Sequence, residues 1–135
     1  MAHYLFKTEP DEYSYADLAR DKRTVWDGVT NALALIHLRA VRKGDAILVY
    51  HTGGERAAVG VAEAVSNARP DPRDPAGRRV VVDVRAVRAL PAPVTLAAFK
   101  SDPVLATSDL VRLPRLGVVP LTAAQWARAL ALAGA

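Results

Sequence analysis

The stretch Asp45-Ala-Ile-Leu-Val-Tyr-His-Thr-Gly-Gly-Glu-Arg-Ala-Ala-Val-Gly-Val-Ala-Glu-Ala-Val65 decides the fold of this chain. Two mainly apolar runs, 45–51 and 57–65, flank a Thr52-Gly53-Gly54 segment whose glycines favour a turn. The connection between the runs is too short for a crossover between parallel strands. The two runs therefore predict neighbouring antiparallel strands.

Further elements are predicted outward from this hairpin on both sides. Alternating apolar and charged residues predict a strand over 80–89, and a short apolar run predicts another over 3–8. Three prolines within 69–77 cannot donate to a strand ladder, so that segment is predicted to be a loop. Helices are predicted over 15–21 and 31–41 and near positions 96 and 123, behind the side-chain caps Ser14, Asn31, Thr95 and Thr122.

Strands with short connections and helices around them predict an α+β fold, a small and mostly antiparallel β-barrel flanked by helices. The 135 residues, 51% of them hydrophobic, fit one domain over 1–135. The chain has no cysteine and hence no thiolate zinc ligand or disulfide. We find neither a signal-peptide pattern nor a membrane-spanning apolar run, and we expect a cytoplasmic protein with no membrane partner.

The charge balance favours a polyanionic partner. Eighteen Lys and Arg against 14 Asp and Glu give a net charge of +4. Six arginines fall between positions 69 and 88: Arg69, Arg73, Arg78, Arg79, Arg85 and Arg88. Because arginine binds phosphate through paired hydrogen bonds but is also common on exposed strands, this segment is either a phosphate-contacting edge or a solvated surface.

Most catalytic signatures are absent from the sequence. It contains no Gly-rich phosphate loop, no HExxH motif and no Gly-x-Ser-x-Gly elbow. The three histidines have no spacing that places two of them on one helical face, so no metal and no cofactor are expected. A hydrolase would have to be assembled from scattered side chains.

Three short segments remain as candidates for a site. Trp26 is expected in a connection between helices, where it either closes one end of the barrel or stacks on a ligand, and Asp27 is expected to hold that loop by accepting backbone hydrogen bonds. Lys7-Thr8-Glu9 and Tyr50-His51 end two strands, either at the mouth of the barrel or as ordinary rim residues. Glu63 shares a strand face with valines and needs either a partner or an edge open to water.

These segments belong to a longer ordered pattern that resembles the EVE domain family. The pattern spans nearly the whole chain, and the order of its blocks is more specific than any block alone. Its blocks are Lys7-Thr8-Glu9-Pro10-Asp11, Trp26-Asp27-Gly28-Val29-Thr30-Asn31, Gly44-Asp45 with Tyr50-His51, Val59 to Glu63, and Arg115-Leu116-Gly117-Val118-Val119-Pro120.

The resemblance implies a PUA-like β-pseudobarrel, similar also to YTH domains, that binds DNA or RNA carrying a modified base, 5-methylcytosine being one candidate. A pocket for an extruded base needs an aromatic face and polar groups for the base edge. By resemblance, Trp26 stacks on the base, Asn31, Thr8 and His51 hydrogen-bond to it, and Lys7, Glu9 and Tyr50 also line the pocket. The arginines expected to meet phosphate are Arg39, Arg42 and Arg115.

The chain departs from the family pattern beside the expected pocket. Residues 32–36 are aliphatic where the family has polar and aromatic side chains, and Gly117 and Val119 replace a serine and a glutamine. Fewer hydrogen bonds to a base imply a changed ligand, a weaker reader or a lost pocket.

Two alternatives to a non-catalytic monomeric reader stay open. One is an amidohydrolase similar to the ASCH domains, which would act on a modified nucleoside through Lys7, Thr8 and Glu63. The other is a protein-interaction module that uses the apolar surface over 32–36.

Overall fold

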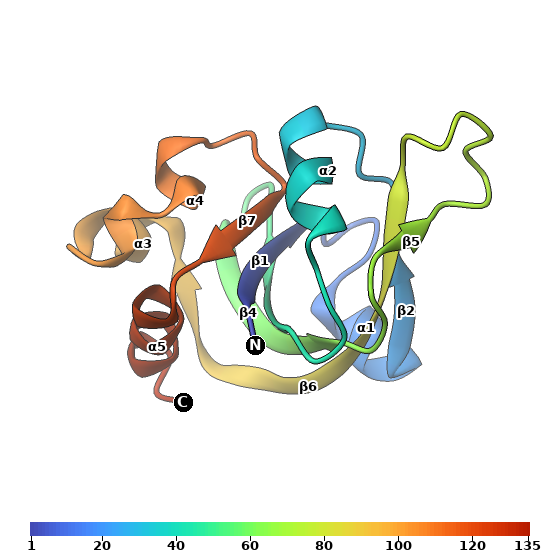
Figure 1. The fold of residues 1–135 in the computed structure, drawn as a ribbon. Helices are drawn as coiled ribbons and strands as arrows, with labels where there is room; N and C mark the ends of the chain where they lie inside the picture. Colours follow the sequence, from blue (N-terminus) through green and yellow to red (C-terminus); the bar gives the residue numbers. More distant parts are fainter.

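Seven strands form one curved sheet in the computed structural model, which describes residues 1–135 (Figure 1). The order is β2-β6-β4-β3-β1-β7, with β5 paired to β6, and only β1 and β3 run parallel. The α+β class and the mostly antiparallel sheet are thus confirmed. The strands are β1 (His3–Thr8), β2 (Arg23–Trp26), β3 (Ala46–His51), β4 (Ala57–Ala64), β5 (Arg69–Pro70), β6 (Val80–Thr95) and β7 (Val118–Leu121).

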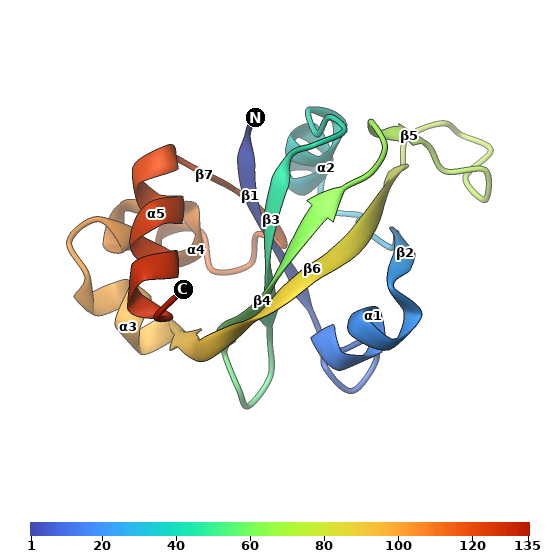
Figure 2. The ribbon, with the colours of Figure 1, turned by 90° about the horizontal axis from the view of Figure 1, so that it is seen from below.

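Short helices surround the sheet. They are α1 (Tyr15–Asp21), α2 (Ala32–Arg39), α3 (Leu96–Ser101), the 3-10 turn η1 (Leu105–Thr107), α4 (Asp109–Arg112) and α5 (Ala123–Leu132). The four predicted caps are all confirmed, because each side chain accepts a hydrogen bond from the backbone amide three residues on. Helices α3, α4 and α5 gather on one side of the molecule, and α1 lies with β2 on the other (Figures 1 and 2). None of the helices combines the length and apolarity needed to cross a bilayer.

Several elements were missed by the sequence reading. Trp26 is the last residue of β2 and not part of a connection between helices. The strand was missed because four residues at a sheet edge are too few to show a recognisable period. Strands β5 and β7 and helix α4 were also not predicted. Strand β6 runs to Thr95, beyond the predicted end at Ala89, and the pairing with β4 skips the stretch 90–93 that holds two prolines.

The sheet is rolled but not closed. In a flat sheet β2 and β1 would be four strand spacings apart, about 19 Å. The rings of Phe6 on β1 and Trp26 on β2 instead lie 5.4 Å apart between centroids. The outermost strands of the path, β2 and β7, are not hydrogen-bonded to each other, so the structure is an open pseudobarrel and not the closed barrel that the connections had indicated. We call the unpaired gap between β2 and the β1–β7 pair the seam.

Helix α1 is held against the sheet by its residue Tyr15, whose ring packs on Gly60 of β4. The Tyr15 hydroxyl donates to the carbonyl of Val61 at 2.7 Å, and the ring lies flat over Gly60. A Cβ atom at Gly60 would stand 2.3 Å from the ring carbon Cε1, closer than any real contact. Glycine is therefore required in β4 at this point.

We expect Gly60→Ala to lower the free energy of unfolding by about 1–3 kcal/mol, the usual cost of overpacking, because the Tyr15 ring must move off its site. Urea denaturation measures the change. Gly54→Ala is the matched control, because nothing lies within 4 Å of a Cβ there. Equal stability of the Gly60 variant and the wild type would show that α1 does not depend on this contact.

A second prediction concerns acid stability. The buried carboxylate of Asp102 accepts hydrogen bonds from Arg128 of α5 at 2.6 Å and from the amides of Val104 and Leu105. The Arg128 guanidinium, followed by these amides, lowers the pKa of Asp102 below its usual 3.8. A lowered pKa in the folded state stabilises the protein above the unfolded-state pKa, and this contribution is lost as pH falls through the folded value.

We therefore expect the unfolding free energy to fall as the pH drops below about 4, and to fall less steeply in Asp102→Asn. Thermal denaturation across this pH range measures both slopes. Asp11→Asn, at an exposed residue, serves as control. The assignment would be wrong if both variants kept the wild-type slope.

Candidate functional site

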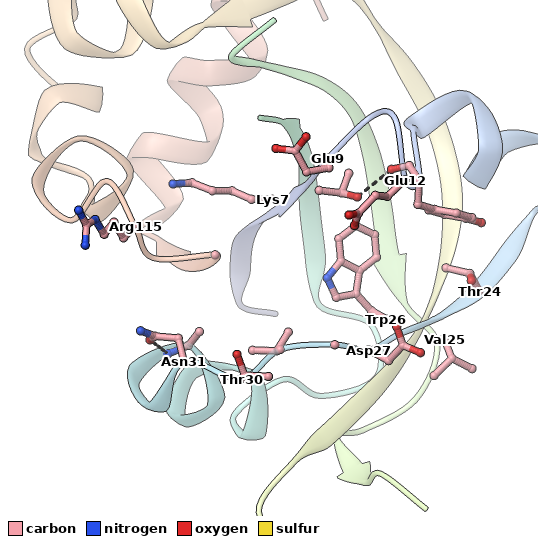
Figure 3. A pocket seen from close by; sticks show the side chains of 16 residues that line it. Lys7, Glu9, Glu12, Thr24, Val25, Trp26, Asp27, Thr30, Asn31 and Arg115 are labelled. Atoms are coloured by element: carbon pink, nitrogen blue, oxygen red, sulfur yellow. Dashed lines mark hydrogen bonds between the residues drawn. The ribbon is translucent and has the colours of Figure 1, made fainter. Parts of the chain in front are cut away.

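The seam opens into a cavity of about 620 Å³, within the range of ~300–1,000 Å³ typical of ligand pockets. One wall comes from the end of β1 and the segment after it, and the other from β2 and the connection to α2 (Figure 3). The loop before β7 supplies the third side. The lining residues fall in 7–9, 12–13, 24–31 and at Ala34, Arg115 and Gly117.

Trp26 forms one wall of this cavity. Its residue surface is only 8% exposed and its ring packs on Phe6, but the indole also lines the open space (Figure 3). The ring is therefore not sealed among aliphatic side chains. A flat aromatic surface at the side of a hollow is the element on which a planar heterocycle stacks.

Lys7 ties the third side of the cavity to β1. Its ammonium donates to the carbonyl of Pro114 at 2.8 Å, and its backbone amide donates to the carbonyl of Gly117 at 3.0 Å. The ammonium also lies 5.8 Å from the centroid of the Tyr50 ring. Burial lowers the pKa of Lys7. These contacts fix the loop that carries Arg115 opposite the indole.

Thr8 and Glu9 line the cavity but are partly used to hold its rim. The Thr8 hydroxyl donates to the carbonyl of Tyr13 at 2.7 Å. The Glu9 carboxylate accepts from the Thr52 hydroxyl at 2.5 Å, and the Glu9 carbonyl accepts from the amides of residues 12 and 13. The segment after β1 is therefore a fixed turn, and it presents Glu12 toward the cavity (Figure 3).

Three polar groups of the lining have no partner within the protein. The Glu12 carboxylate and the Arg115 guanidinium are exposed and form no hydrogen bond or ion pair. The Asn31 side-chain oxygen caps α2 by accepting from the Ala34 amide, which leaves its NH₂ group free to donate. The cavity thus offers a free carboxylate acceptor and free donors around one aromatic wall.

Sequence reasoning had not singled out several lining residues. Glu12, Tyr13 and Thr24 were not identified, because Glu12 and Tyr13 follow a turn and Thr24 lies on the unrecognised strand β2. Asp27 also lines the cavity, but it does not hold its own loop as expected. Its carboxylate instead pairs with Arg73 at 2.5 Å, from the loop after β5.

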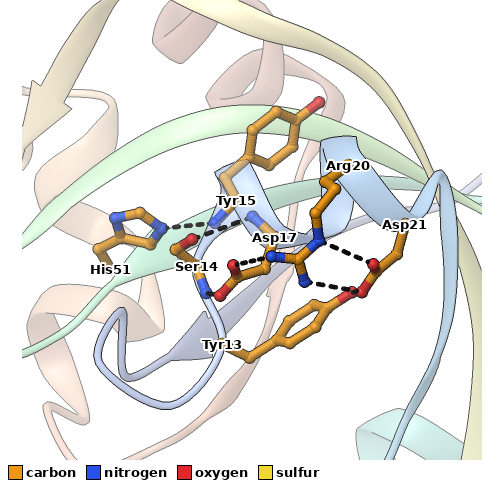
Figure 4. Close-up of polar contacts among 7 residues, drawn as sticks. All are labelled: Tyr13, Ser14, Tyr15, Asp17, Arg20, Asp21 and His51. Atoms are coloured by element: carbon orange, nitrogen blue, oxygen red, sulfur yellow. Dashed lines mark hydrogen bonds and ion pairs between the residues drawn. The ribbon is translucent and has the colours of Figure 1, made fainter.

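Tyr50 and His51 are not among the lining residues. The His51 Nε2 atom accepts from the backbone amide of Tyr15 at 2.9 Å (Figure 4). The ring proton therefore sits on Nδ1 and faces Glu55 at 2.6 Å. Tyr50 is 3% exposed beneath Lys7. Both side chains support the walls, and neither reaches the open space.

The predicted phosphate contacts lie in two places. Arg115 is on the cavity, whereas Arg39 and Arg42 are at the opposite end of α2 from Asn31. The Arg42 guanidinium donates to the carbonyls of Arg39 and Val41, and so closes the helix end. The Arg39 guanidinium donates to the carbonyl of Arg78.

Glu63 does not line the cavity. Its carboxylate is about one-third exposed and pairs with Arg85 of the neighbouring strand at 3.1 Å, which gives this residue both a partner and access to water. The three residues required by the amidohydrolase alternative are therefore not brought together, since only Lys7 and Thr8 are lining residues.

The aliphatic run over 32–36 leaves the cavity open. Of these residues only Ala34 lines it, while Leu35 is buried in the core. Leu33 and Ile36 face outward and are 39% and 59% exposed. The helix carries apolar residues on both its inner and outer sides, as expected, and the large ones point away from the seam.

We expect His51→Ala to cost about 1–3 kcal/mol of stability, because it removes the acceptor of the Tyr15 amide at the start of α1. Chemical denaturation measures the loss. Glu55→Gln, which keeps an acceptor for Nδ1–H on a side chain 44% exposed, should change stability by less than about 0.5 kcal/mol. A His51 variant as stable as the wild type would argue against this structural role.

Comparison with known proteins places the chain in a family. The EVE domain model matches residues 2–132. Human thymocyte nuclear protein 1 is 31% identical over 74% of this chain and 56% of its own length, so the chain spans little more than half of that curated relative. The structure of Rpa0253 from Rhodopseudomonas palustris superposes with a TM-score of 0.94 at 38% identity, covering 99% of this chain and 94% of that one.

A complex is also among the similar structures. The human THYN1 protein bound to DNA containing 5-methylcytosine superposes with a TM-score of 0.92 at 29% identity, covering 100% of this chain and 99% of that one. The family match over almost all residues agrees with the open pseudobarrel and with the blocks of sequence that surround its seam. The chain belongs to the EVE domain family.

Proposed function

We propose that this chain is a non-catalytic module that binds nucleic acid carrying a modified base and takes that base into the seam cavity. The observation that carries the proposal is the pairing of an indole wall with polar side chains that have no partner of their own. An extruded base needs both, since it loses its stacking neighbours and its pairing partner together. The THYN1 complex with 5-methylcytosine DNA supports the same ligand class for a relative of this fold.

Trp26 is proposed to replace the stacking that the base loses. Stacking on an aromatic side chain contributes about 1–3 kcal/mol per base, while extrusion costs a few kcal/mol. Stacking alone does not offset extrusion, so contacts to the base edge and to phosphate have to supply the rest. The extrusion cost is lowest for a mismatched or already single-stranded base, so preference for a modified base has to come from contacts inside the cavity.

The base edge is proposed to meet Glu12, Asn31 and Arg115. The pairing edge of a cytosine presents an amino donor beside two acceptors, one ring nitrogen and one carbonyl oxygen. The Glu12 carboxylate suits the amino group, and the free NH₂ of Asn31 suits an acceptor. Arg115 lies at the rim with its guanidinium unpaired and is proposed to meet either the base edge or the adjoining phosphate.

A direct test uses fluorescence in a Trp126→Phe background, where Trp26 is the sole indole. Trp126, on α5, packs against His3 of β1 and is not a lining residue, so its replacement leaves the cavity intact. Adding an oligonucleotide with one 5-methylcytosine is expected to quench Trp26 emission with saturation. Binding without any change in that emission would contradict stacking on Trp26.

In the same assay Arg115→Ala and Glu12→Gln are expected to weaken binding roughly tenfold or more, since hydrogen bonds to charged groups contribute about 1.5–3 kcal/mol. Both residues are exposed, so stability should change by less than about 0.5 kcal/mol. Arg88→Ala, at an exposed residue outside the cavity, is the control. The proposal fails if wild-type protein shows no salt-dependent binding to modified or unmodified strands.

A further inference from the structure

We infer that the loop between β5 and β6, residues 71–79, together with Arg39 at the end of α2, is a second contact surface for the sugar–phosphate backbone beside the bound base. The inference rests on the proposed function and deepens it, because it makes the ligand a polynucleotide and not a free nucleoside. The loop projects from the body of the molecule on the side of β2 and β5 (Figures 1 and 2).

The two acidic residues of this loop, Asp71 and Asp74, both accept hydrogen bonds from other residues of the loop. The Asp74 carboxylate accepts from the backbone amides of Ala76, Arg78 and Arg79 at 3.2, 2.9 and 2.8 Å. The Asp71 carboxylate is buried and accepts from the amide and the guanidinium of Arg73. The loop is therefore ordered by its own carboxylates, and a phosphate would meet a surface that is already formed.

Two of the three arginine side chains of the loop are left free by this arrangement, since only Arg73 pairs with carboxylates. Arg78 and Arg79 are exposed and form no side-chain hydrogen bond or ion pair. By contrast, Arg69 and Arg85 in the same stretch of sequence pair with Asp83 and Glu63 across strands. Of the arginine cluster in the sequence, Arg69, Arg73 and Arg85 are thus paired with carboxylates, whereas Arg78 and Arg79 are unpaired neighbours on the projecting loop and suit an anionic partner.

Arg39 extends the unpaired charge onto α2. Its guanidinium donates one hydrogen bond, to the carbonyl of Arg78, and so joins the helix end to the loop without losing its charge to a carboxylate. Arg42 lies one turn further and likewise bonds only to carbonyls. The nearest acid in sequence, Asp45, is buried and accepts from the amides of Ala2 and Arg42. The exposed guanidinium groups of Arg39 and Arg42 therefore have no carboxylate partner at this end of α2.

The basic corner adjoins the cavity directly. Arg73 of the loop pairs with Asp27, a lining residue, at 2.5 Å. Along α2, Arg39 is five residues beyond the lining residue Ala34, a rise of about 7.5 Å. A strand whose base enters the seam therefore passes within reach of Arg39, Arg78 and Arg79.

The test compares Arg78→Ala/Arg79→Ala with Arg88→Ala/Lys100→Ala. Each double variant removes two exposed cations, and the control pair lies outside the loop. The Arg78 carbonyl that Arg39 contacts is retained. Fluorescence anisotropy with a 12-nucleotide DNA strand holding one central 5-methylcytosine gives the dissociation constant at several salt concentrations. Quenching of Trp26 by the nucleoside 5-methyl-2′-deoxycytidine is measured alongside.

For the loop variant we expect the slope of log K against log salt to become shallower by about 1.4, since each lost single-strand phosphate contact removes about 0.7. Nucleoside binding and the control pair should match the wild type. An unchanged slope, or an equal loss in both double variants, overturns the loop inference but leaves the proposed function standing where the wild type still prefers the modified strand. Absence of any wild-type binding overturns both.

Discussion

The contact between Phe6 and Trp26 is the constraint on which the site depends. It joins strands that stand four places apart in the sheet order, and so it holds the sheet in a rolled form without a hydrogen-bonded closure. Because burying two aromatic rings against each other is favourable but sets no register, the roll is stable while its edges stay unpaired. The cavity exists because the Phe6–Trp26 contact keeps the sheet rolled while the seam between β2 and the β1–β7 pair stays unpaired.

Local signals in the sequence were sufficient for the helix caps and the central hairpin but not for the short strands β2, β5 and β7, and long-range packing decided the site. The caps at Ser14, Asn31, Thr95 and Thr122 depend on a few neighbouring residues, and all four form. The hairpin of β3 and β4 also follows from local pattern and turn. Which strand borders the seam is not local, and for that reason Tyr50 and His51 were grouped with the pocket although β3 lies one strand further in. Their side chains instead support Lys7 and the start of α1.

Helix α2 explains how the family's departure in this chain is accommodated. The Asn31 cap is kept, so the helix begins at the same point whether polar or aliphatic residues follow. Only Ala34 of the run 32–36 faces the cavity, and the bulky Leu33 and Ile36 point outward. The aliphatic run therefore does not fill the cavity, and of its residues only Ala34 contributes to the lining. Under the proposed function, recognition of the base would rest more heavily on Glu12, Arg115 and the indole than on the helix.

The unpaired edges of the sheet also bear on how such a domain changes its ligand. Since no ladder of backbone hydrogen bonds crosses between β2 and β7, the width of the opening is set by side chains alone. Exchanging a rim residue for a larger or smaller one adjusts that width and shifts no strand register elsewhere. A closed barrel lacks this freedom, because widening it means adding a strand or altering its shear. Divergence of such an opening toward ligands of different size thus requires a handful of point substitutions and no change of architecture.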